Sequence, residues 1–177
     1  IALALDVCKE VGIEREIALR GMHKVQPDNG ALIEWNLILK SSNYTFINGM
    51  AANDPVSTLD IWNNINKRFG FKKESCIFLN SREDRPVRTV QMIKLTLEQI
   101  KPNYLIIRGS KLTKIIDDLS SLSPKTKIET FDLGEKLETF LDLVGKLPNN
   151  CLIYAIGNQV GAGQEILELI SRLKTND

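Results

Sequence analysis

The stretch Phe46-Ile-Asn-Gly-Met-Ala-Ala-Asn-Asp-Pro-Val-Ser-Thr58 decides the fold class of this chain. Phe46 and Ile47 favour a buried β-strand, whereas the residues after them are typical of turns and caps. Asp54 before Pro55 fits a helix N-cap followed by proline at the first helical position, where a backbone N–H is not needed. The stretch therefore predicts a strand, a polar loop and a helix N-terminus beside the carboxyl end of the strand. In an open α/β sheet, phosphates and nucleotides bind at such a place.

Strand-like and helix-like segments alternate along the rest of the chain. Short apolar runs predict strands over residues 33–39, 44–47, 75–79, 104–107, 127–131 and 151–156. Apolar stripes at spacings of three and four residues predict amphipathic helices between them. The first two runs flank Ser41-Ser42-Asn43 and predict an antiparallel hairpin. The pattern indicates an α/β fold: a Rossmann-like, mostly parallel sheet with an antiparallel edge hairpin and helices on both faces.

The first 30 residues predict a separate segment. Residues 1–26 have a helical pattern from the first position, without an initiator Met or a signal peptide, so we interpret the chain as a fragment of a longer protein. Pro27, Asn29 and Gly30 predict a hinge linker over residues 27–30. Residues 31–177 are then the Rossmann-like domain.

Composition excludes several classes of protein. The 23 basic and 22 acidic residues give a net charge of +1, so the basic surface of a nucleic-acid-binding protein is absent. No apolar run approaches the roughly 18–20 residues of a membrane span. Cys8, Cys76 and Cys151 lack the spacing of a zinc site, and the last two lie in apolar runs. We expect buried, reduced thiols and a cytoplasmic location.

Polar residues gather after the predicted strands rather than before them. They are Asn48, Gly49, Asn53 and Asp54 after the second strand, residues 80–85 and Arg88 after the third, residues 108–111 after the fourth, Asp132 after the fifth, and residues 157–163 after the sixth. Because the carboxyl ends of parallel strands share one edge of a sheet, this asymmetry predicts a binding edge.

Each of these elements has a simpler interpretation. The Asn53-Asp54-Pro55 segment could be a helix cap alone, and Arg82, Arg85 and Arg88 could form a solvated face. The arginines nevertheless favour anion recognition, because guanidinium groups match the geometry of carboxylates and phosphates. The glycine turn at 157–163 is neither a dinucleotide fingerprint nor a P-loop. His23 has no nucleophile to pair with, so we expect it to be structural or exposed.

The sequence also lacks the parts of a complete catalytic centre. There is no Gly-x-x-x-x-Gly-Lys-Ser/Thr motif, and no His, Cys or carboxylate cluster has metal-ligand spacing. We therefore expect no metal site in this chain.

Five motifs resemble one known family. They are Ala-Leu-Arg-Gly-Met22, Gln26-Pro-Asp-x-Gly-Ala31, Phe46-Ile-Asn-Gly-x-Ala-Ala-Asn-Asp-Pro55, Asn80-Ser-Arg-x-Asp-Arg85 and Gly157-Asn-x-x-Gly161. Together they resemble the ligase subunit of poly-γ-glutamate synthase (the CapB/PgsB family), a branch of the Mur-ligase-like amide ligases. The resemblance extends over essentially the whole chain, from the end of the central ATPase domain to the C-terminus. It implies that residues 1–26 are the helical tail of the preceding ATPase domain.

This resemblance implies an ATP-dependent, ADP-forming ligase that activates a glutamate carboxylate as an acyl phosphate and joins it to an amine. The present chain would be its mobile C-terminal lobe, similar to the Mur ligase C-terminal domain and inactive alone. ATP and Mg²⁺ (or Mn²⁺) would be bound mainly by the upstream domain. Other implied partners are glutamate, the growing poly-γ-glutamate and small membrane subunits, which would associate a cytoplasmic enzyme with the membrane. The alternatives are a non-catalytic nucleotide- or ligand-binding regulatory module, or a pure interaction domain.

The candidate site residues fall into two sets. The nucleotide-binding candidates are Asn48, Gly49, Asn53 and Asp54; the phosphate- or glutamate-binding candidates are Arg82, Asp84, Arg85, Arg88, Arg108, Ser110, Gly157, Asn158 and Gly161. By resemblance, Asn48 and Asn53 match the Asp-x-x-x-x-Asn-Pro segment of Mur ligases, with Asn48 in place of the usual Asp. Ala31 occupies the position of an arginine that contacts phosphate in many Mur ligases, a role that Arg82 or Arg85 could supply.

Overall fold

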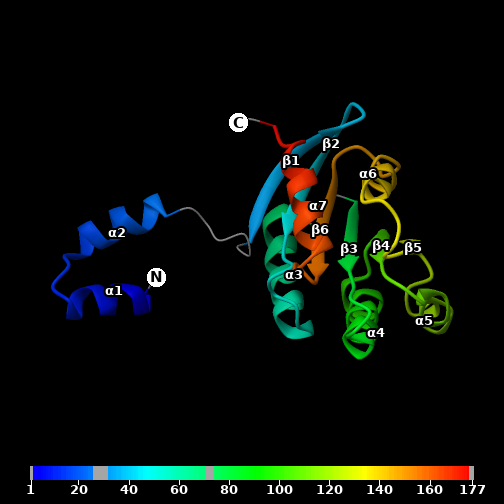
Figure 1. Ribbon diagram of the computed structural model, residues 1–177, viewed down its shortest axis with the longest axis horizontal. Helices are drawn as coiled ribbons and strands as arrows, with labels where there is room; N and C mark the ends of the chain where they lie inside the picture. The colour runs from blue at the N-terminus through cyan, green and yellow to red at the C-terminus, as the bar shows by residue number, and fades with distance from the viewer. Residues whose placement is uncertain (1, 26–31, 71–73, 176–177) are drawn as a thin grey trace.

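A six-stranded sheet forms the centre of the protein. The computed structural model describes residues 2–25, 32–70 and 74–175. The strands are β1 (Ile33–Leu39), β2 (Ser42–Asn48), β3 (Ser75–Asn80), β4 (Tyr104–Arg108), β5 (Lys127–Phe131) and β6 (Cys151–Gly157). Strands β1 and β2 pair antiparallel and every other neighbouring pair is parallel, in the order β1-β2-β6-β3-β4-β5 (Figure 1). The predicted fold class and edge hairpin are therefore confirmed.

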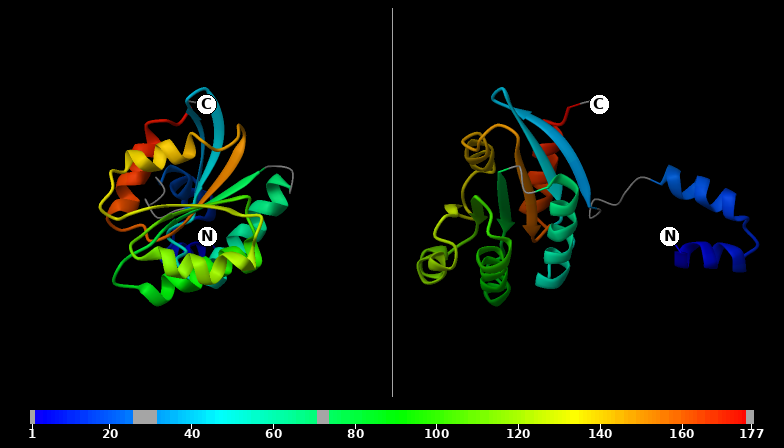
Figure 2. Two further views of the ribbon diagram at one scale, coloured as in Figure 1. Left: turned by 90° about the vertical axis from the view of Figure 1, so that its right-hand side faces the viewer. Right: turned by 180° about the vertical axis from the view of Figure 1, so that it is seen from behind.

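Helices cover both faces of this sheet. One layer contains α3 (Pro55–Phe69), α4 (Pro86–Leu95) with the π-helical turn η1 (Thr96–Ile100), and α5 (Leu112–Leu119) with the 3₁₀ turn η2 (Ser120–Leu122). The opposite layer contains α6 (Glu138–Val144) and α7 (Ala162–Ser171) (Figure 2). Each face packs its own hydrophobic core against the sheet. The two layers explain why the central strands are continuously apolar, since both of their faces are buried.

Strand β6 shows this alternation most clearly. Leu152, Tyr154 and Ile156 belong to the core beneath α3, α4 and α5. Ile153 and Ala155 belong to the core beneath α6 and α7. Because successive side chains of a strand point to opposite faces, one apolar run can serve both cores.

The order of the strands positions the binding edge. Strand β6 is last in the chain but lies between β2 and β3. The chain leaves β3 for α4 on one face of the sheet, and it leaves β6 for α7 on the other face (Figure 2). Connections that diverge from neighbouring parallel strands open a crevice at their carboxyl ends, where open α/β sheets bind ligands.

The β2–α3 loop is held firmly against this edge. The Asp54 side chain accepts a hydrogen bond of 2.9 Å from the Ser57 amide, which confirms the predicted N-cap and lowers the pKa of Asp54. The Thr58 hydroxyl donates to the Ala52 carbonyl at 2.8 Å, and the Tyr154 hydroxyl donates to the Thr58 carbonyl at 3.2 Å. Gly49 lies against the Tyr154 ring so closely that a Cβ atom would overlap it. Glycine is therefore required at this position.

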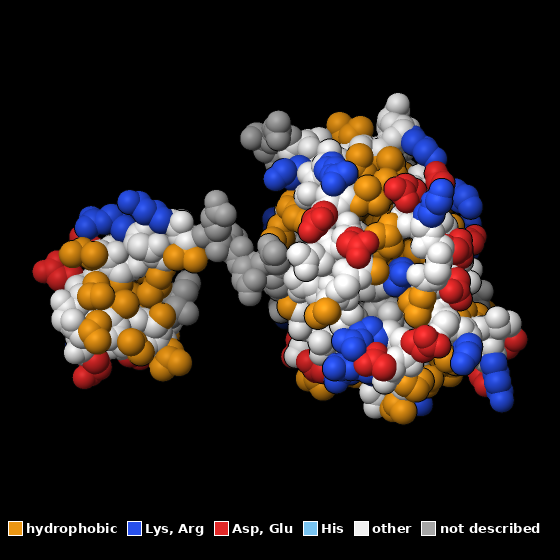
Figure 3. All heavy atoms as spheres, viewed as in Figure 1, with side chains coloured by type: hydrophobic (Ala, Val, Ile, Leu, Met, Phe, Trp, Pro, Cys, Tyr) orange, Lys and Arg blue, Asp and Glu red, His pale blue; other side chains and the backbone are white. Residues whose placement is uncertain are grey.

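The N-terminal helices carry exposed apolar side chains. α1 (Ala2–Glu10) and α2 (Arg15–Lys24) contact each other. Their large exposed hydrophobic residues, with those of the adjoining turns, are Leu3, Val7, Val11, Ile13, Ile17 and Val25 (Figure 3). The predicted hinge at 27–30 and Ala31 lie outside the described residues, so the domain boundary stays a prediction. Within the described ranges, no helix is both long and apolar enough to cross a bilayer.

The cysteines give a test of this core. Cys76 and Cys151 are free and buried, as predicted, whereas Cys8 is half-buried. Burial raises the pKa of Cys151 to about 12 and that of Cys76 well above its usual value. Since the thiolate is the reactive form, we expect only Cys8 to react quickly with an aromatic disulfide reagent at pH 8, and all three thiols to react in denaturant. The Cys8→Ser variant retains only Cys76 and Cys151. Rapid reaction of this variant in the native state would show that these two thiols are accessible, which would contradict their burial.

Candidate functional site

Two adjoining hollows lie at the carboxyl ends of β3 and β6. The first, here called the arginine pocket, is lined by Asn53, Leu79, Asn80, Ser81, Arg82, Arg85, Arg88, Thr89, Met92, Gly157 and Asn158. The second, here called the outer groove, is lined by Asn80, Ser81, Arg82, Glu83, Asp84, Arg108, Leu133, Asn158, Val160 and Ala162. The outer groove has a volume of about 410 Å³, within the usual range for small-molecule sites. The hollows share four lining residues, so a single ligand could occupy both.

Arg82 is committed to a partner within the β3–α4 loop. Its Nε donates to Asp84 Oδ1 at 2.8 Å and its Nη2 donates to Asp84 Oδ2 at 2.7 Å. This bidentate hydrogen bonding lowers the pKa of Asp84 and raises the pKa of Arg82. Planar pairing of this kind fixes the orientation of the guanidinium. Arg82 therefore borders both hollows with its charge largely balanced.

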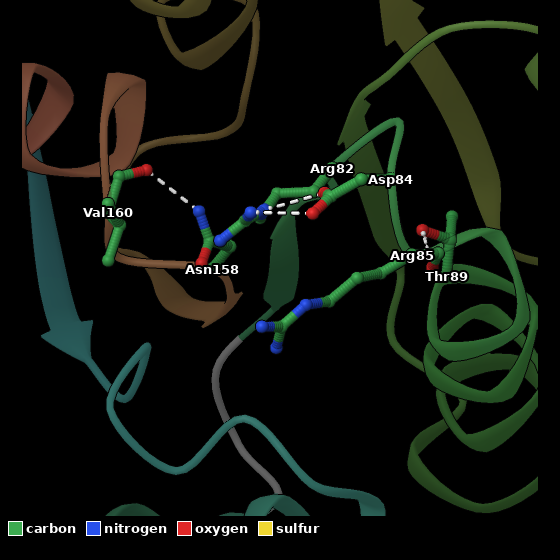
Figure 4. Close-up of polar contacts among 6 residues, drawn as sticks. All are labelled: Arg82, Asp84, Arg85, Thr89, Asn158 and Val160. Atoms are coloured by element: carbon green, nitrogen blue, oxygen red, sulfur yellow. Dashed lines mark hydrogen bonds and ion pairs between the residues drawn. The ribbon is translucent and has the colours of Figure 1, made fainter.

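Arg85 brings an unbalanced positive charge to the pocket. Among the described residues, no hydrogen bond or ion pair engages its guanidinium, although its charge contributes to the lowered pKa of Asp84. Its side chain extends from the beginning of α4 into the space beneath Asn158 (Figure 4). An exposed guanidinium at the mouth of a pocket keeps all of its donors available for a carboxylate or a phosphate.

Arg88 links the pocket to the β2–α3 loop. Its Nη1 donates to Asn53 Oδ1 at 3.0 Å. This contact orients the Asn53 amide, whose nitrogen is a hydrogen-bond donor suited to an anionic ligand. The contact joins one candidate from the nucleotide-binding set to one from the phosphate-binding set.

The loops after β3, β4 and β6 are tied together by short hydrogen bonds. Asn80, the last residue of β3, donates from Nδ2 to the Asn158 carbonyl at 2.6 Å, and its own carbonyl accepts from the Asn158 amide at 2.8 Å. The Ser81 amide and hydroxyl both donate to the Arg108 carbonyl, at 2.9 and 2.8 Å. These hydrogen bonds hold together the loops whose residues line the two hollows.

Arg108 is the most buried arginine of the site. It ends β4 with 9% of its surface exposed, and its Nη2 donates to the Leu133 carbonyl at 2.7 Å. Burial lowers its pKa, while the exposed carboxylates Glu165 and Asp132 act in the opposite direction. Its Nε has no hydrogen-bond partner. Arginine remains protonated in proteins, so this buried charge is available inside the groove.

Two glycines allow the close approach of these loops. Gly157, at φ +96°, lies where a Cβ atom would overlap the Asn80 carbonyl oxygen. Gly163, in the first turn of α7, lies where a Cβ atom would overlap the Asn158 carbonyl oxygen. The glycine-rich turn of the sequence therefore packs β6 and α7 against the end of β3.

The structure brings together only part of the predicted set. Asn53, Arg82, Asp84, Arg85, Arg88, Arg108, Gly157 and Asn158 line one hollow or both. Asn48 is buried with its Oδ1 accepting from the Met50 amide, Gly49 packs on Tyr154, and Asp54 caps α3. Ser110 and Gly161 line neither hollow. These five candidates shape the surrounding loops, and a direct role in binding stays a prediction for them.

Sequence reasoning missed several lining residues. Asn80 and Ser81 were placed on the predicted polar edge without being named as site candidates, and Thr89 and Leu133 were not predicted at all, yet all four line the hollows. Asn80 and Ser81 carried a usable signal, because they are the first polar residues after a buried strand. Leu133 carried none, since its contribution is a backbone carbonyl that the β4–β5 pairing brings to Arg108.

The part of the chain that the structure describes contains no group of three or more His, Cys, Asp or Glu side chains placed to hold a metal ion. The polar groups that do converge are mainly guanidinium and amide donors. This donor set fits an anionic organic ligand such as the phosphates of ATP, and it does not fit Mg²⁺, which takes oxygen ligands.

Comparisons with known proteins agree on a single family. Residues 38–173 match the family described as the poly-gamma-glutamate synthase CapB C-terminal domain. PGA synthase CapB of Bacillus subtilis (strain 168) is 34% identical over 175 residues, which cover 98% of this chain and 44% of that protein. Capsule biosynthesis protein CapB of Bacillus anthracis is 32% identical over 171 residues, which cover 96% of this chain and 36% of that protein. The chain thus spans less than half the length of these relatives.

Solved structures of Mur ligases share the fold. MurF from Acinetobacter baumannii aligns with a TM-score of 0.60 at 13% identity, over 93% of this chain and 35% of that one. MurC from Thermotoga maritima aligns with a TM-score of 0.56 at 14% identity, over 96% and 36%. MurF from Thermotoga maritima, solved in complex with ADP, aligns with a TM-score of 0.54 at 10% identity, over 95% and 36%. At these identities the likeness establishes the fold alone.

Proposed function

This chain belongs to the poly-gamma-glutamate synthase CapB family as its C-terminal domain, and from that premise we propose that it is the acceptor-binding lobe of an ATP-dependent, ADP-forming amide ligase. In the proposed reaction, ATP phosphorylates the γ-carboxylate of one glutamate unit. The α-amine of another unit then attacks the acyl phosphate, forms the γ-linked amide and releases phosphate. The product is poly-γ-glutamate.

The observation that carries this proposal is the convergence of four arginines on two joined hollows at the carboxyl edge of the sheet. Glutamate, acyl phosphate and ATP are all anionic, and guanidinium groups hold carboxylates and phosphates in defined orientations. Fixed donors that stabilise developing negative charge are a common source of rate enhancement in acyl and phosphoryl transfer. A cationic edge of this kind would meet these needs.

We assign the two hollows to different parts of the substrates. The arginine pocket adjoins the β2–α3 loop, so Asn53 and the free Arg85 charge would meet phosphate oxygens there. The outer groove is larger and contains the buried Arg108, so it would receive the acceptor glutamate or the end of the growing polymer.

The remaining parts of the ligase would lie outside this chain. We propose that Mg²⁺ (or Mn²⁺) is held mainly by an upstream ATPase domain. The exposed apolar face of α1 and α2 (Figure 3) is a suitable surface for contact with that domain. Closure of the lobe over bound ATP would complete the site, as lid and domain closure does in many enzymes.

The proposal is tested by the release of ADP from the full-length protein. We expect ADP formation from ATP to depend on added glutamate and to be accompanied by γ-linked polymer. Aspartate, which is one methylene shorter, serves as the matched comparison and should support slower release. If no amino acid stimulates ADP release while ATP still binds, the ligase function is wrong for this protein.

A further inference from the structure

Two buried polar atoms at the centre of the site have no hydrogen-bond partner. Within the described residues they are Asn80 Oδ1, an acceptor, and Arg108 Nε, a donor. Leaving a buried polar group unpaired is destabilising, so such groups are uncommon in folded proteins. Here both occur among the residues that line the outer groove. Their position suggests a ligand that supplies both missing partners.

Asn80 and Arg108 are neighbours in the sheet. They are register partners at the carboxyl ends of the parallel strands β3 and β4. Paired residues of adjacent strands place their side chains on the same face, about one strand spacing apart. The residues that carry the unpaired acceptor and the unpaired donor therefore share one face of the sheet, and both line the outer groove.

One of the two unpaired atoms accepts hydrogen bonds and the other donates them. The Asn80 amide is oriented by its Nδ2, which donates to the Asn158 carbonyl at 2.6 Å, and an amide oxygen such as Oδ1 only accepts. The Arg108 guanidinium is oriented by its Nη2, which donates to the Leu133 carbonyl, and a guanidinium N–H such as that of Nε only donates. The missing partners are thus an N–H or O–H donor for Asn80 and an acceptor, preferably anionic, for Arg108.

We propose that Asn80 and Arg108 together bind the head group of the acceptor amino acid, with Asn80 Oδ1 accepting from its α-amine and Arg108 donating to its α-carboxylate. This inference rests on the proposed ligase function and adds two residues with separate roles. A neutral primary amine has two N–H bonds and a lone pair, so it can donate to Asn80 and still direct the lone pair at an acyl phosphate. The head group of an α-amino acid carries this combination, with the donor amine and the anionic carboxylate attached to the same carbon atom.

The test compares ligands that lack one half of the head group. Glutarate retains both carboxylates of glutamate without the amine, and γ-aminobutyrate retains the amine without the α-carboxylate. Calorimetric binding to the full-length protein, in the presence of a non-hydrolysable ATP analogue, measures the affinity for each. We expect Asn80→Ala to weaken glutamate binding by about tenfold and to leave glutarate binding within about twofold, as for loss of one buried hydrogen bond.

Asn80→Asp is the matched control for the structural bond to Asn158. It retains an oxygen acceptor at the position of Oδ1 and loses the Nδ2 donor, so it should retain the preference for glutamate over glutarate. If Asn80→Asp and Asn80→Ala lose this preference equally, Asn80 acts through the Asn158 contact and the amine assignment is wrong. The same conclusion follows if Asn80→Ala weakens glutamate and glutarate alike.

The role of Arg108 is tested separately from that of Asn80. We expect Arg108→Gln to weaken glutamate and glutarate binding by about tenfold and to leave γ-aminobutyrate within about twofold. Equal losses for all three ligands would overturn the carboxylate assignment. Absence of glutamate binding to the unmodified protein would overturn both assignments, whereas the expected binding pattern without glutamate-dependent ADP release would reject only the ligase function.

Discussion

Arg85→Ala in the full-length protein is expected to lower kcat/KM for glutamate-dependent ADP formation by about 10²-fold, the usual scale for loss of one donor that stabilises charge in a transition state. The reason is the state of its guanidinium, which no hydrogen bond or ion pair engages in the described part of the chain. Arg82 is neutralised by Asp84, and Arg88 donates to Asn53. Arg85 is therefore the arginine of the pocket whose donors are all available to a ligand.

Two matched variants define the specificity of this effect. Arg172→Ala removes the same type of side chain from the exposed C-cap of α7, where no residue of either hollow lies, and should leave kcat/KM within about twofold. Arg85→Lys retains the charge and loses the planar fork, so its loss should be intermediate. Unchanged kcat/KM in Arg85→Ala would remove Arg85 from the site and favour the simpler interpretation of a solvated surface residue.

Gly157→Ala is expected to lower the free energy of unfolding by about 4 kcal/mol, combining backbone strain with overpacking of the core. Gly157 has φ +96°, and an added Cβ would overlap the Asn80 carbonyl oxygen and lie 2.9 Å from Leu79 Cδ1. The backbone of β3 cannot move away, because Asn80 is hydrogen-bonded to Asn158 on the same loop. Thermal unfolding of this chain should show a midpoint lowered by roughly 8–16 °C.

Gly161→Ala separates the effect of backbone strain on stability from the effect of steric overlap with an added Cβ atom. Gly161 also has a positive φ, +71°, but no atom lies within 4 Å of the position of an added Cβ. Its loss of stability should therefore be smaller, about 2 kcal/mol from backbone strain alone. If the two variants lose equal stability, the close packing of β6 on the end of β3 does not govern the response to substitution.

Local sequence signals predicted the elements of the fold because their causes are local. The Asp54-Pro55 cap, the alternation of apolar runs and the hairpin around residues 41–43 depend on neighbours within a few residues, and the structure confirms all three. Arg82 and Arg85 of the β3–α4 loop and Arg88 in the first turn of α4 were also visible, since they follow shortly after a buried strand. The sequence could not show that Arg82 is paired with Asp84 while Arg85 is free, because side-chain geometry decides this.

The class of the fold, the polar edge and the positive charge of that edge could all be predicted from the amino-acid sequence, since each follows from residue type and periodicity along the chain. The strand order could not, because the last strand, β6, is inserted between β2 and β3 by the packing of the whole sheet. That insertion places Asn158 against Asn80, and the β3–β4 register places Asn80 beside Arg108. Contacts between residues about 30 to 80 positions apart depend on how the whole sheet packs, so no local pattern encodes them.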